Sequence, residues 1–219
     1  MDEFLKWYPL AFSVFYPATA IYGRSWLLKR RTGVSRTLVS RAERHALLSW
    51  HTLMFAVFHG TMIAVGVQAV MRTGLIPGYD RLWSIPLLVN PWIQFAGVAV
   101  TLASWLLIWS AQESLGESWR IGVDPTVDNK LKTGGLYASM RHPIYTALLG
   151  ITVGLLLLMP TVLSLLTVGV TIVGLRTEMA LEEAHLLRAH GPVYQRYMDS
   201  TGKWLPRFGK STLASTPQV

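Results

Sequence analysis

Apolar residues run along this chain in long uninterrupted blocks and do not alternate with polar residues at a helical or strand period. A helix needs about 20 predominantly apolar residues to cross the hydrocarbon core of a bilayer. Two shorter blocks flank Met159-Pro160 and are together too long for one crossing, which indicates a tight helical hairpin. The pattern predicts five membrane-spanning helices, Tyr8–Leu28, Ala46–Val70, Pro91–Ala111, Ile144–Met159 and Thr161–Leu175.

Charged and aromatic residues fall at or near the ends of these spans. Arg24 interrupts the first span, and we expect its long side chain to reach the membrane surface. Asn90-Pro91 provides a clean start for the third span. Tryptophans near the span ends are expected to form an aromatic belt at the interface. They are Trp7, Trp26, Trp83, Trp92, Trp119 and Trp204.

The composition agrees with this interpretation. Of the 219 residues, 51% are hydrophobic and 15% are charged, whereas soluble domains carry about 25% charged residues. The chain has no cysteine, which excludes a disulfide scaffold and a cysteine-ligated zinc or iron–sulfur site. We therefore expect an all-α polytopic membrane protein of about five transmembrane helices, with neither a disordered chain nor a soluble domain as an alternative.

The net charge of +8 comes from 20 Lys+Arg against 12 Asp+Glu. Basic residues gather between the first two predicted spans, at Lys29, Arg30, Arg31, Arg36, Arg41 and Arg44. This placement favours a topology signal and contact with anionic lipid over binding to nucleic acid. By the positive-inside rule the first loop is cytoplasmic and the N-terminus is outside. Counting onward puts the polar segment Gln112–Arg141 and the tail from Arg176 on the cytoplasmic side.

One polar segment carries side chains that could bind a ligand or take part in a reaction. It runs from Leu131 through Gly135 and Tyr137 to Arg141-His142-Pro143-Ile144-Tyr145. Its glycines let a ligand approach the backbone closely, and its proline starts the fourth span. Free N–H groups at that helix start, together with Arg141, would hold a carboxylate or a phosphate. Taken alone, an Arg-His-Pro at a membrane border is more often an interfacial anchor.

A second segment presents Glu182-Glu183. Residues 176–190 are rich in helix formers, so we expect them to continue the fifth span until Gly191-Pro192 stops the helix. Two carboxylates there would suit an ammonium group or ribose hydroxyls, although such a pair is most often a solvated face. His51 and His59 could both face the bundle interior, where packing is the favoured role. Without a carboxylate they make a poor metal site, and no metal site is predicted.

Together the two segments resemble the isoprenylcysteine carboxyl methyltransferase family and its bacterial and archaeal relatives, which are integral-membrane enzymes that use S-adenosylmethionine. The resemblance covers about Trp119 to Phe208, with His190 in place of the family's aromatic residue. It implies a catalytic region in 116–210, while the apolar blocks predict transmembrane helices in 1–115 and the last residues, 211–219, are expected to form a flexible tail. The matching residues are Leu131, Gly135, Tyr137, Arg141, His142, Pro143, Tyr145, Glu182, Glu183, Leu186, Gly191, Tyr194, Tyr197 and Pro206.

The resemblance also implies a cofactor, S-adenosyl-L-methionine, in a pocket that opens to the cytoplasm. For catalysis we expect Glu183 and Arg176, which lies seven residues earlier on the same helical face and could orient an acceptor carboxylate. Capping of the fifth span by Arg176 is an equally good explanation. The residues implied for cofactor binding are Leu131, Gly135, Tyr137, Arg141, His142, Tyr145, Glu182 and Glu183.

The implied activity is methyl transfer to a lipophilic acceptor, above all the carboxylate of an isoprenylcysteine-like small molecule or prenylated peptide that enters sideways from the lipid. A phospholipid amine and a small thiol remain open as acceptors. The second enzyme class is an NADPH-dependent membrane sterol or steroid reductase, which commonly has Asn where this chain has Ile144. A non-catalytic scaffold would have no reason to gather these polar groups. The expected location is a bacterial or archaeal inner membrane, or its equivalent.

Overall fold

The computed structural model describes residues 2–32, 50–79, 82–116 and 131–207, with the backbone but not the side chains of residues 32, 50–59 and 62. The predictions for His51, His59, Arg36, Arg41, Arg44, Trp119 and the tail 211–219 lie outside this description. Regular secondary structure in the described ranges is helical, with only isolated β-bridges in addition. This confirms the all-α fold class.

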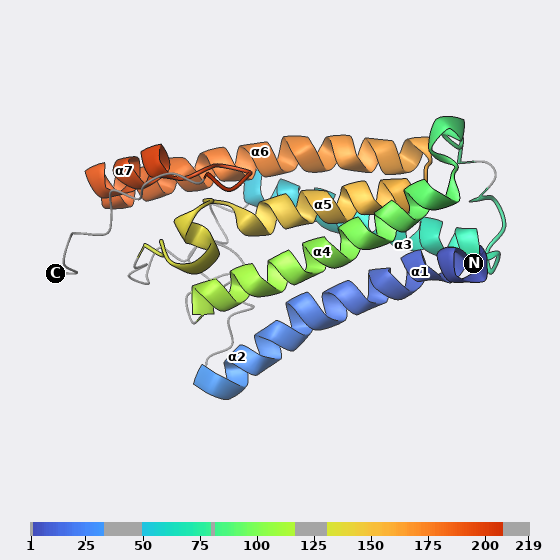
Figure 1. The fold of residues 1–219 in the computed structure, drawn as a ribbon, viewed down its shortest axis with the longest axis horizontal. Helices are drawn as coiled ribbons and strands as arrows, with labels where there is room; N and C mark the ends of the chain where they lie inside the picture. The colour runs from blue at the N-terminus through green and yellow to red at the C-terminus, as the bar shows by residue number, and fades with distance from the viewer. Residues whose placement is uncertain (1, 33–49, 80–81, 117–130, 208–219) are drawn as a thin grey trace.

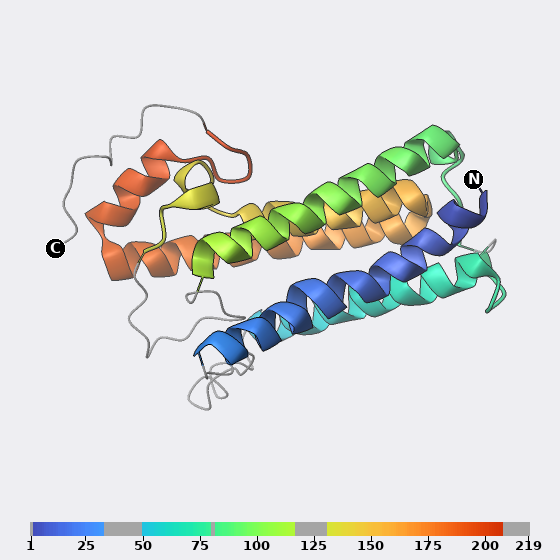
Figure 2. The same ribbon diagram turned by 60° about the horizontal axis from the view of Figure 1, so that its bottom comes forward.

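The chain begins with one continuous helical rod, in which α1 (Asp2–Tyr16), the π-helical segment η1 (Pro17–Gly23) and α2 (Arg24–Thr32) follow without a break. The rod lies alongside α3 (Trp50–Thr73), while α4 (Pro91–Leu115), α5 (Pro143–Leu158) and α6 (Val162–His190) pack beside one another (Figures 1 and 2). A short α7 (Pro192–Ser200) then folds against the end of α6. Short 3-10 turns, η4 (Pro86–Leu88) and η6 (Gly135–Ala138), precede α4 and α5.

Within the described residues, the first predicted span lies in the rod and each of the other four lies mainly on one helix, α3, α4, α5 or α6. Among the described residues, α4 and α6 are long and apolar enough to cross a membrane, and α5 is a shorter apolar helix. The hairpin is confirmed, because α5 ends at Leu158 and α6 begins at Val162. The extension of α6 to His190 is confirmed as well, and the helix stops at Gly191, whose φ of +52° lies in the left-handed region that favours glycine. That all five helices cross a membrane stays a prediction.

Small residues allow α4 and α5 to approach closely. A Cβ at Gly97 would lie 2.8 Å from the carbonyl oxygen of Gly154, and a Cβ at Gly154 would lie 2.6 Å from Thr101 Cγ2. A Cβ at Gly150 would run into the hydroxyl of Ser104. Small residues four apart are the usual means by which apolar helices bring their backbones together. The α4–α5 pair therefore forms a tightly packed support for the turn η6 and the start of α5.

Arg24 differs from the sequence-based expectation. Its side chain is only 2% exposed, and it bonds to the carboxylate of Glu113 and, through Nη2 at 3.0 Å, to the carbonyl oxygen of Gln112. The amide of Gln112 in turn donates to the carbonyl of Ala20 at 2.9 Å. The prediction that Arg24 reaches the membrane surface is wrong, because α4 supplies the partners that a buried charge requires.

Large apolar side chains are exposed along α4 and α6, as at Leu102, Leu106, Leu166 and Val173. Exposed tryptophans lie at both ends of the bundle. Trp92 opens α4 at the end that holds the N-terminus, and Trp26 lies on α2 at the other end (Figure 1). This distribution agrees with an aromatic belt on either side of an apolar zone.

Candidate functional site

The polar segments singled out in the sequence meet at the end of the bundle away from the N-terminus (Figure 1). The turn η6 and the first residues of α5 come from one side, and the last turns of α6 with α7 come from the other. After α7 the chain returns to η6, where residues 201–203 run beside residues 139–142. Segments that are about 40 to 60 residues apart in the sequence are thereby brought into contact.

Glu183 is the centre of this site, and its side chain is 11% exposed. Its Oε1 accepts from Arg141 Nε at 2.9 Å and lies 3.1 Å from His142 Nε2. Its Oε2 accepts from Lys203 Nζ at 2.8 Å. These four residues are called the Glu183 cluster. Charge-assisted hydrogen bonds of this kind are about twice as strong as neutral ones, so one carboxylate ties together α5, α6 and the segment after α7.

The electrostatic state of Glu183 follows from these contacts. Burial raises the pKa of its carboxyl, but the hydrogen bonds from His142, Lys203 and Arg141 outweigh burial and lower the pKa to about 2. Glu183 is therefore ionised at any physiological pH. A carboxylate held in this way cannot take up a proton during a reaction near neutral pH, which makes it a fixed negative charge.

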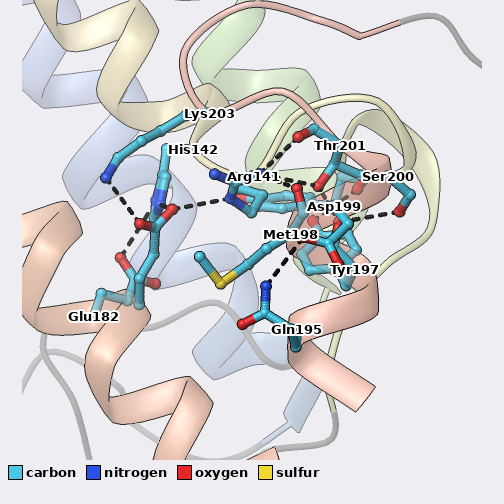
Figure 3. A network of polar contacts seen from close by, with 12 residues as sticks. Arg141, His142, Glu182, Gln195, Tyr197, Met198, Asp199, Ser200, Thr201 and Lys203 are labelled. Atoms are coloured by element: carbon cyan, nitrogen blue, oxygen red, sulfur yellow. Dashed lines mark hydrogen bonds and ion pairs between the residues drawn. The ribbon is translucent and has the colours of Figure 1, made fainter. Parts of the chain in front are cut away.

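Arg141 also holds the segment after α7. Its Nη1 donates to the carbonyl oxygens of Met198 at 2.8 Å and Thr201 at 2.6 Å, at the end of α7 (Figure 3). Its backbone N–H donates to the carbonyl of Gly202 at 2.8 Å. A Cβ at Gly202 would collide with the carbonyl of Leu205. The tight bend at Gly202 is what carries Lys203 back to the cluster.

Three buried tyrosines line the other side of the site. Tyr197 donates its hydroxyl to the carbonyl oxygen of Tyr137 at 2.7 Å, and the Tyr194 and Tyr197 side chains are almost fully buried. Burial, the largest effect at each, raises the pKa of the Tyr137, Tyr194 and Tyr197 hydroxyls. These hydroxyls stay protonated at neutral pH, so they are hydrogen-bond donors and not bases.

Glu182 has a different environment from its neighbour. Its side chain is 38% exposed, and its Oε2 lies 3.6 Å from His142 Nδ1. The ring of Tyr145 stacks on that of His142 with centroids 5.4 Å apart. His142, which is almost fully buried, lies between the two carboxylates (Figure 3). Glu182 therefore keeps carboxylate surface that a ligand can reach.

The turn η6 is fitted to the end of α4. Gly135 has a φ of +61°, and a Cβ there would lie 2.6 Å from Ser114 Oγ. The next N–H, of Leu136, donates to the same hydroxyl at 3.4 Å. Both the backbone conformation and the lack of space require glycine at this position. Ser114 in the last turn of α4 thus sets the position of the turn that leads to Tyr137 and Arg141.

The structure brings together most of the predicted site residues, but not all. Arg141, His142, Tyr145, Glu182 and Glu183 form one contact network, and Tyr137 is tied to it through Tyr197 and Thr201, whereas Gly135 is packed against Ser114 of α4. Leu131 is half-buried, and no described contact joins it to the Glu183 cluster. Arg176 is exposed on α6, and within the described ranges it takes no part in the cluster.

Sequence reasoning missed Lys203 and Ser114. Between Tyr197 and Pro206 the charged residues are Asp199 and Lys203. The single positive charge of Lys203 in this part of the second motif could have indicated it as a site residue. Ser114 carried no signal, because its role depends on the arrival of a turn 21 residues later in the chain.

The residues present fit a zwitterionic cofactor such as S-adenosylmethionine. The reachable carboxylate of Glu182 suits an ammonium group or ribose hydroxyls. At the start of α5, His142 is the residue before the helix and no side chain caps the first turn. Pro143 has no N–H, so the N–H groups of Ile144 and Tyr145 are the donors of that turn that no side chain caps. The Glu182 carboxylate, which can accept from an ammonium group, is thus close to the N–H groups at the start of α5, which can donate to a carboxylate.

Comparison with known proteins agrees with this chemistry. Residues 92–192, a little under half of the chain, match the family model of phospholipid methyltransferases. No curated protein and no solved structure gives a significant match. The matched stretch contains α4, α5, α6 and all of the Glu183 cluster except Lys203. The match indicates a methyltransferase of a membrane-bound kind, and it leaves the more specific isoprenylcysteine resemblance as a prediction.

Proposed function

We propose that this protein is an integral-membrane, S-adenosylmethionine-dependent methyltransferase that acts on a lipophilic acceptor. The observation that carries the proposal is the position of the Glu183 cluster and Glu182 at the end of an apolar helical bundle, within the stretch that matches the phospholipid methyltransferases. A polar, ligand-accessible site at the end of apolar helices suits a reaction between a water-soluble cofactor and a lipid-soluble partner.

When bound, S-adenosylmethionine supplies a methyl group on a positively charged sulfur, whose S–CH₃ bond breaks as an acceptor oxygen or nitrogen forms the new bond to carbon. Glu182 would contact the cofactor's ammonium group or ribose, and the open first turn of α5 would contact its carboxylate. Glu183 would act as a positioning residue, since all of its described contacts go to Arg141, His142 and Lys203.

The residues need to position and desolvate the reactants more than to move protons. In-line displacement at a methyl group depends on alignment and on the exclusion of water. The protonated tyrosines and the permanently ionised Glu183 agree with this requirement, because neither is suited to general acid–base catalysis near neutral pH. For a carboxylate acceptor, a low-dielectric site also favours the reaction, because the charges of the sulfonium and the carboxylate neutralise each other. An amine acceptor reacts as the neutral amine and takes over the positive charge.

Two acceptor classes have support. The motif resemblance favours the carboxylate of an isoprenylcysteine-like molecule, and the family match favours the amine of a phospholipid. Both have long apolar chains, and transfer of such a chain into water costs about 0.8 kcal/mol per CH₂. Entry of the acceptor sideways from the lipid avoids that cost. The exposed apolar surface of α4 and α6 supports such a route.

We test the proposal with purified protein in one detergent and radiolabelled S-adenosylmethionine. Methyl transfer is compared for N-acetyl-S-farnesylcysteine, phosphatidylethanolamine and N-acetylcysteine. Transfer to one of the two lipid acceptors, at a rate well above that for N-acetylcysteine, is the expected result. Equal rates for all three, or transfer to the short thiol alone, would contradict a lipophilic acceptor. Calorimetric titration with S-adenosylmethionine and NADPH distinguishes a methyltransferase from a reductase.

A further inference from the structure

A second polar cluster lies between the N-terminal rod and α4, at the same end of the bundle as the Glu183 cluster. It consists of Arg24 at the start of α2 with Gln112 and Glu113 on α4, and is called the Arg24 cluster. Arg24 is 2% exposed and Gln112 is 4% exposed. Arg24 Nη1 donates to the carboxylate of Glu113, and Nη2 donates to the carbonyl oxygen of Gln112. The cluster thus holds a full positive charge inside a helix–helix contact.

The hydrogen bonding of this cluster is incomplete. Arg24 Nε and Gln112 Oε1 are buried and lack a hydrogen-bond partner in the described structure. Buried polar atoms are nearly always paired in proteins, so the unpaired Nε–H of Arg24 points to a missing acceptor, whereas Gln112 Oε1 lacks a donor. The seven-residue π-helical segment Pro17–Gly23 comes directly before Arg24. Such segments are rare and are frequent at functional sites, where they reorient side chains.

Glu113 is a partner that can leave Arg24. Its side chain is 63% exposed, and its second oxygen lies 3.9 Å from Nη1 of Arg31, which is itself 65% exposed. The carboxylate can therefore turn toward Arg31 and solvent while it keeps a cation beside it. An incoming anion can then take its place on Arg24. The unpaired Nε–H of Arg24 is a further donor for such an anion.

The last turn of α4 connects this cluster to the candidate active site. Gln112 and Glu113 contact Arg24, and the next residue, Ser114, supports Gly135 and Leu136 of η6. A molecule that binds its anionic group at Arg24 would therefore lie beside the turn that leads to the cofactor-binding residues. Arg176, in contrast, is exposed on α6 and has no described contact with either cluster.

We propose that the Arg24 cluster binds the oxyanion of the acceptor's head group. The ligand class is a lipid-soluble molecule with a carboxylate or phosphate, groups that a guanidinium recognises well. In an isoprenylcysteine-like acceptor this group is the carboxylate, and in an aminophospholipid it is the phosphate next to the amine. This proposal rests on the proposed function, since it names the residue that selects the acceptor.

The test uses Arg24→Gln, Glu113→Gln and the control Arg30→Gln, which alters an exposed arginine of α2 that stacks on Trp26. For each variant we measure the KM of N-acetyl-S-farnesylcysteine and of dihexanoyl phosphatidylethanolamine, the Kd of S-adenosylmethionine by calorimetry, and the melting temperature. Arg24→Gln is expected to raise the acceptor KM by about tenfold or more, because it removes a charge-assisted hydrogen bond. The cofactor Kd is expected to stay within twofold of the wild-type value. Glu113→Gln removes the competing carboxylate and is expected to lower that KM.

The two substitutions have opposite expected effects on KM, which separates a binding site from a structural ion pair. If both raise the KM, or if Arg24→Gln leaves it within twofold of the wild type, the proposal is wrong. Should Arg24→Gln fail to fold, Arg24→Lys and Glu113→Gln carry the test, and a raised KM in Glu113→Gln overturns the proposal. The acceptor whose KM responds identifies carboxylate or phosphate as the group bound.

A failure of the proposed function gives a different result. In that case wild-type protein transfers no methyl group to either acceptor. Calorimetric binding of dihexanoyl phosphatidylethanolamine and N-acetyl-S-farnesylcysteine to wild type and Arg24→Gln then still tests the site. Weaker binding of one ligand to Arg24→Gln supports the Arg24 cluster without the enzyme activity, and equal binding rejects it.

Discussion

Lys203 donates a hydrogen bond to Glu183 at 2.8 Å, although α7 and a tight bend at Gly202 lie between the two residues. The same carboxylate accepts from Arg141 and contacts His142, both at the start of α5. One buried anion therefore determines where three segments of the chain meet. The arrangement gives the site a rigid polar base, and it leaves Glu182 as the carboxylate that a ligand can reach.

Removal of the negative charge at Glu183 should destabilise the protein. Glu183→Gln leaves Arg141, Lys203 and His142 without their common partner, and loss of one member of a buried ion pair costs about 3 kcal/mol or more. We expect a clear drop in the melting temperature in detergent. Glu3→Gln, which alters an exposed carboxylate paired with Lys6, is the control and should have no measurable effect. An unchanged melting temperature for Glu183→Gln would show that the cluster does not hold these segments together.

Acid should destabilise the wild type through the same residue. Because the pKa of Glu183 is lowered to about 2 in the folded protein from a usual value of 4.5, its ionised form contributes stability above pH 4.5. That contribution is lost as the pH falls from 4.5 toward 2. The melting temperature of the wild type should fall more steeply across this window than that of Glu183→Gln. Parallel curves for the two proteins would contradict the lowered pKa.

Glu182 should affect cofactor affinity more than stability, since its side chain is 38% exposed. We expect Glu182→Gln to weaken S-adenosylmethionine binding by about tenfold, the usual cost of a charged hydrogen bond. The melting temperature should change little. Asp199→Asn, at an exposed carboxylate of α7 bonded to Gln195, is the matched control. Unchanged calorimetric affinity for Glu182→Gln would remove this residue from the cofactor site.

The close approach of α4 and α5 should not tolerate a methyl group. Gly154→Ala places a Cβ 2.6 Å from Thr101 Cγ2, and such overpacking costs about 1–3 kcal/mol. Gly169 lies on α6 with nothing within 4 Å of its Cβ position. Gly169→Ala should therefore be neutral or slightly stabilising, since alanine favours a helix. Thermal unfolding of the two variants compares them directly, and equal melting temperatures would argue against the tight contact.

The proposed topology of five spans, with the N-terminus outside, can be tested with single cysteines because the chain has none of its own. Leu87 is 86% exposed in the turn before α4 and Val193 is 49% exposed on α7. An impermeant maleimide added to intact cells should label Leu87→Cys and leave Val193→Cys unlabelled until the cells are permeabilised. The reverse pattern would invert the topology, and labelling of both would reject the three spans predicted between Leu87 and Val193.

The sequence by itself determined the long helices and, at Met159-Pro160 and Gly191-Pro192, where two of them end. Apolar blocks, the hairpin at Met159-Pro160 and the stop at Gly191-Pro192 depend on residues that are close in the chain, and local steric and hydrogen-bonding rules decide them. The sequence also predicts both motifs at one end of the bundle, because two apolar blocks, which form a hairpin, lie between them. Within the motifs, however, the sequence treats Glu182 and Glu183 alike.

Only the tertiary structure decided which charges are buried and with what partners. Arg24 meets Glu113 across 89 positions of the chain, and Arg141 meets Glu183 across 42. Glu183 is buried among cations while Glu182 faces outward, because adjacent residues on a helix point about 100° apart and only packing selects which one faces the neighbouring segments. Lys203 reaches the site through a bend after α7 that no local pattern encodes. Such pairings depend on how the helices pack, since the energy of a buried charge is set by groups that only folding brings near it.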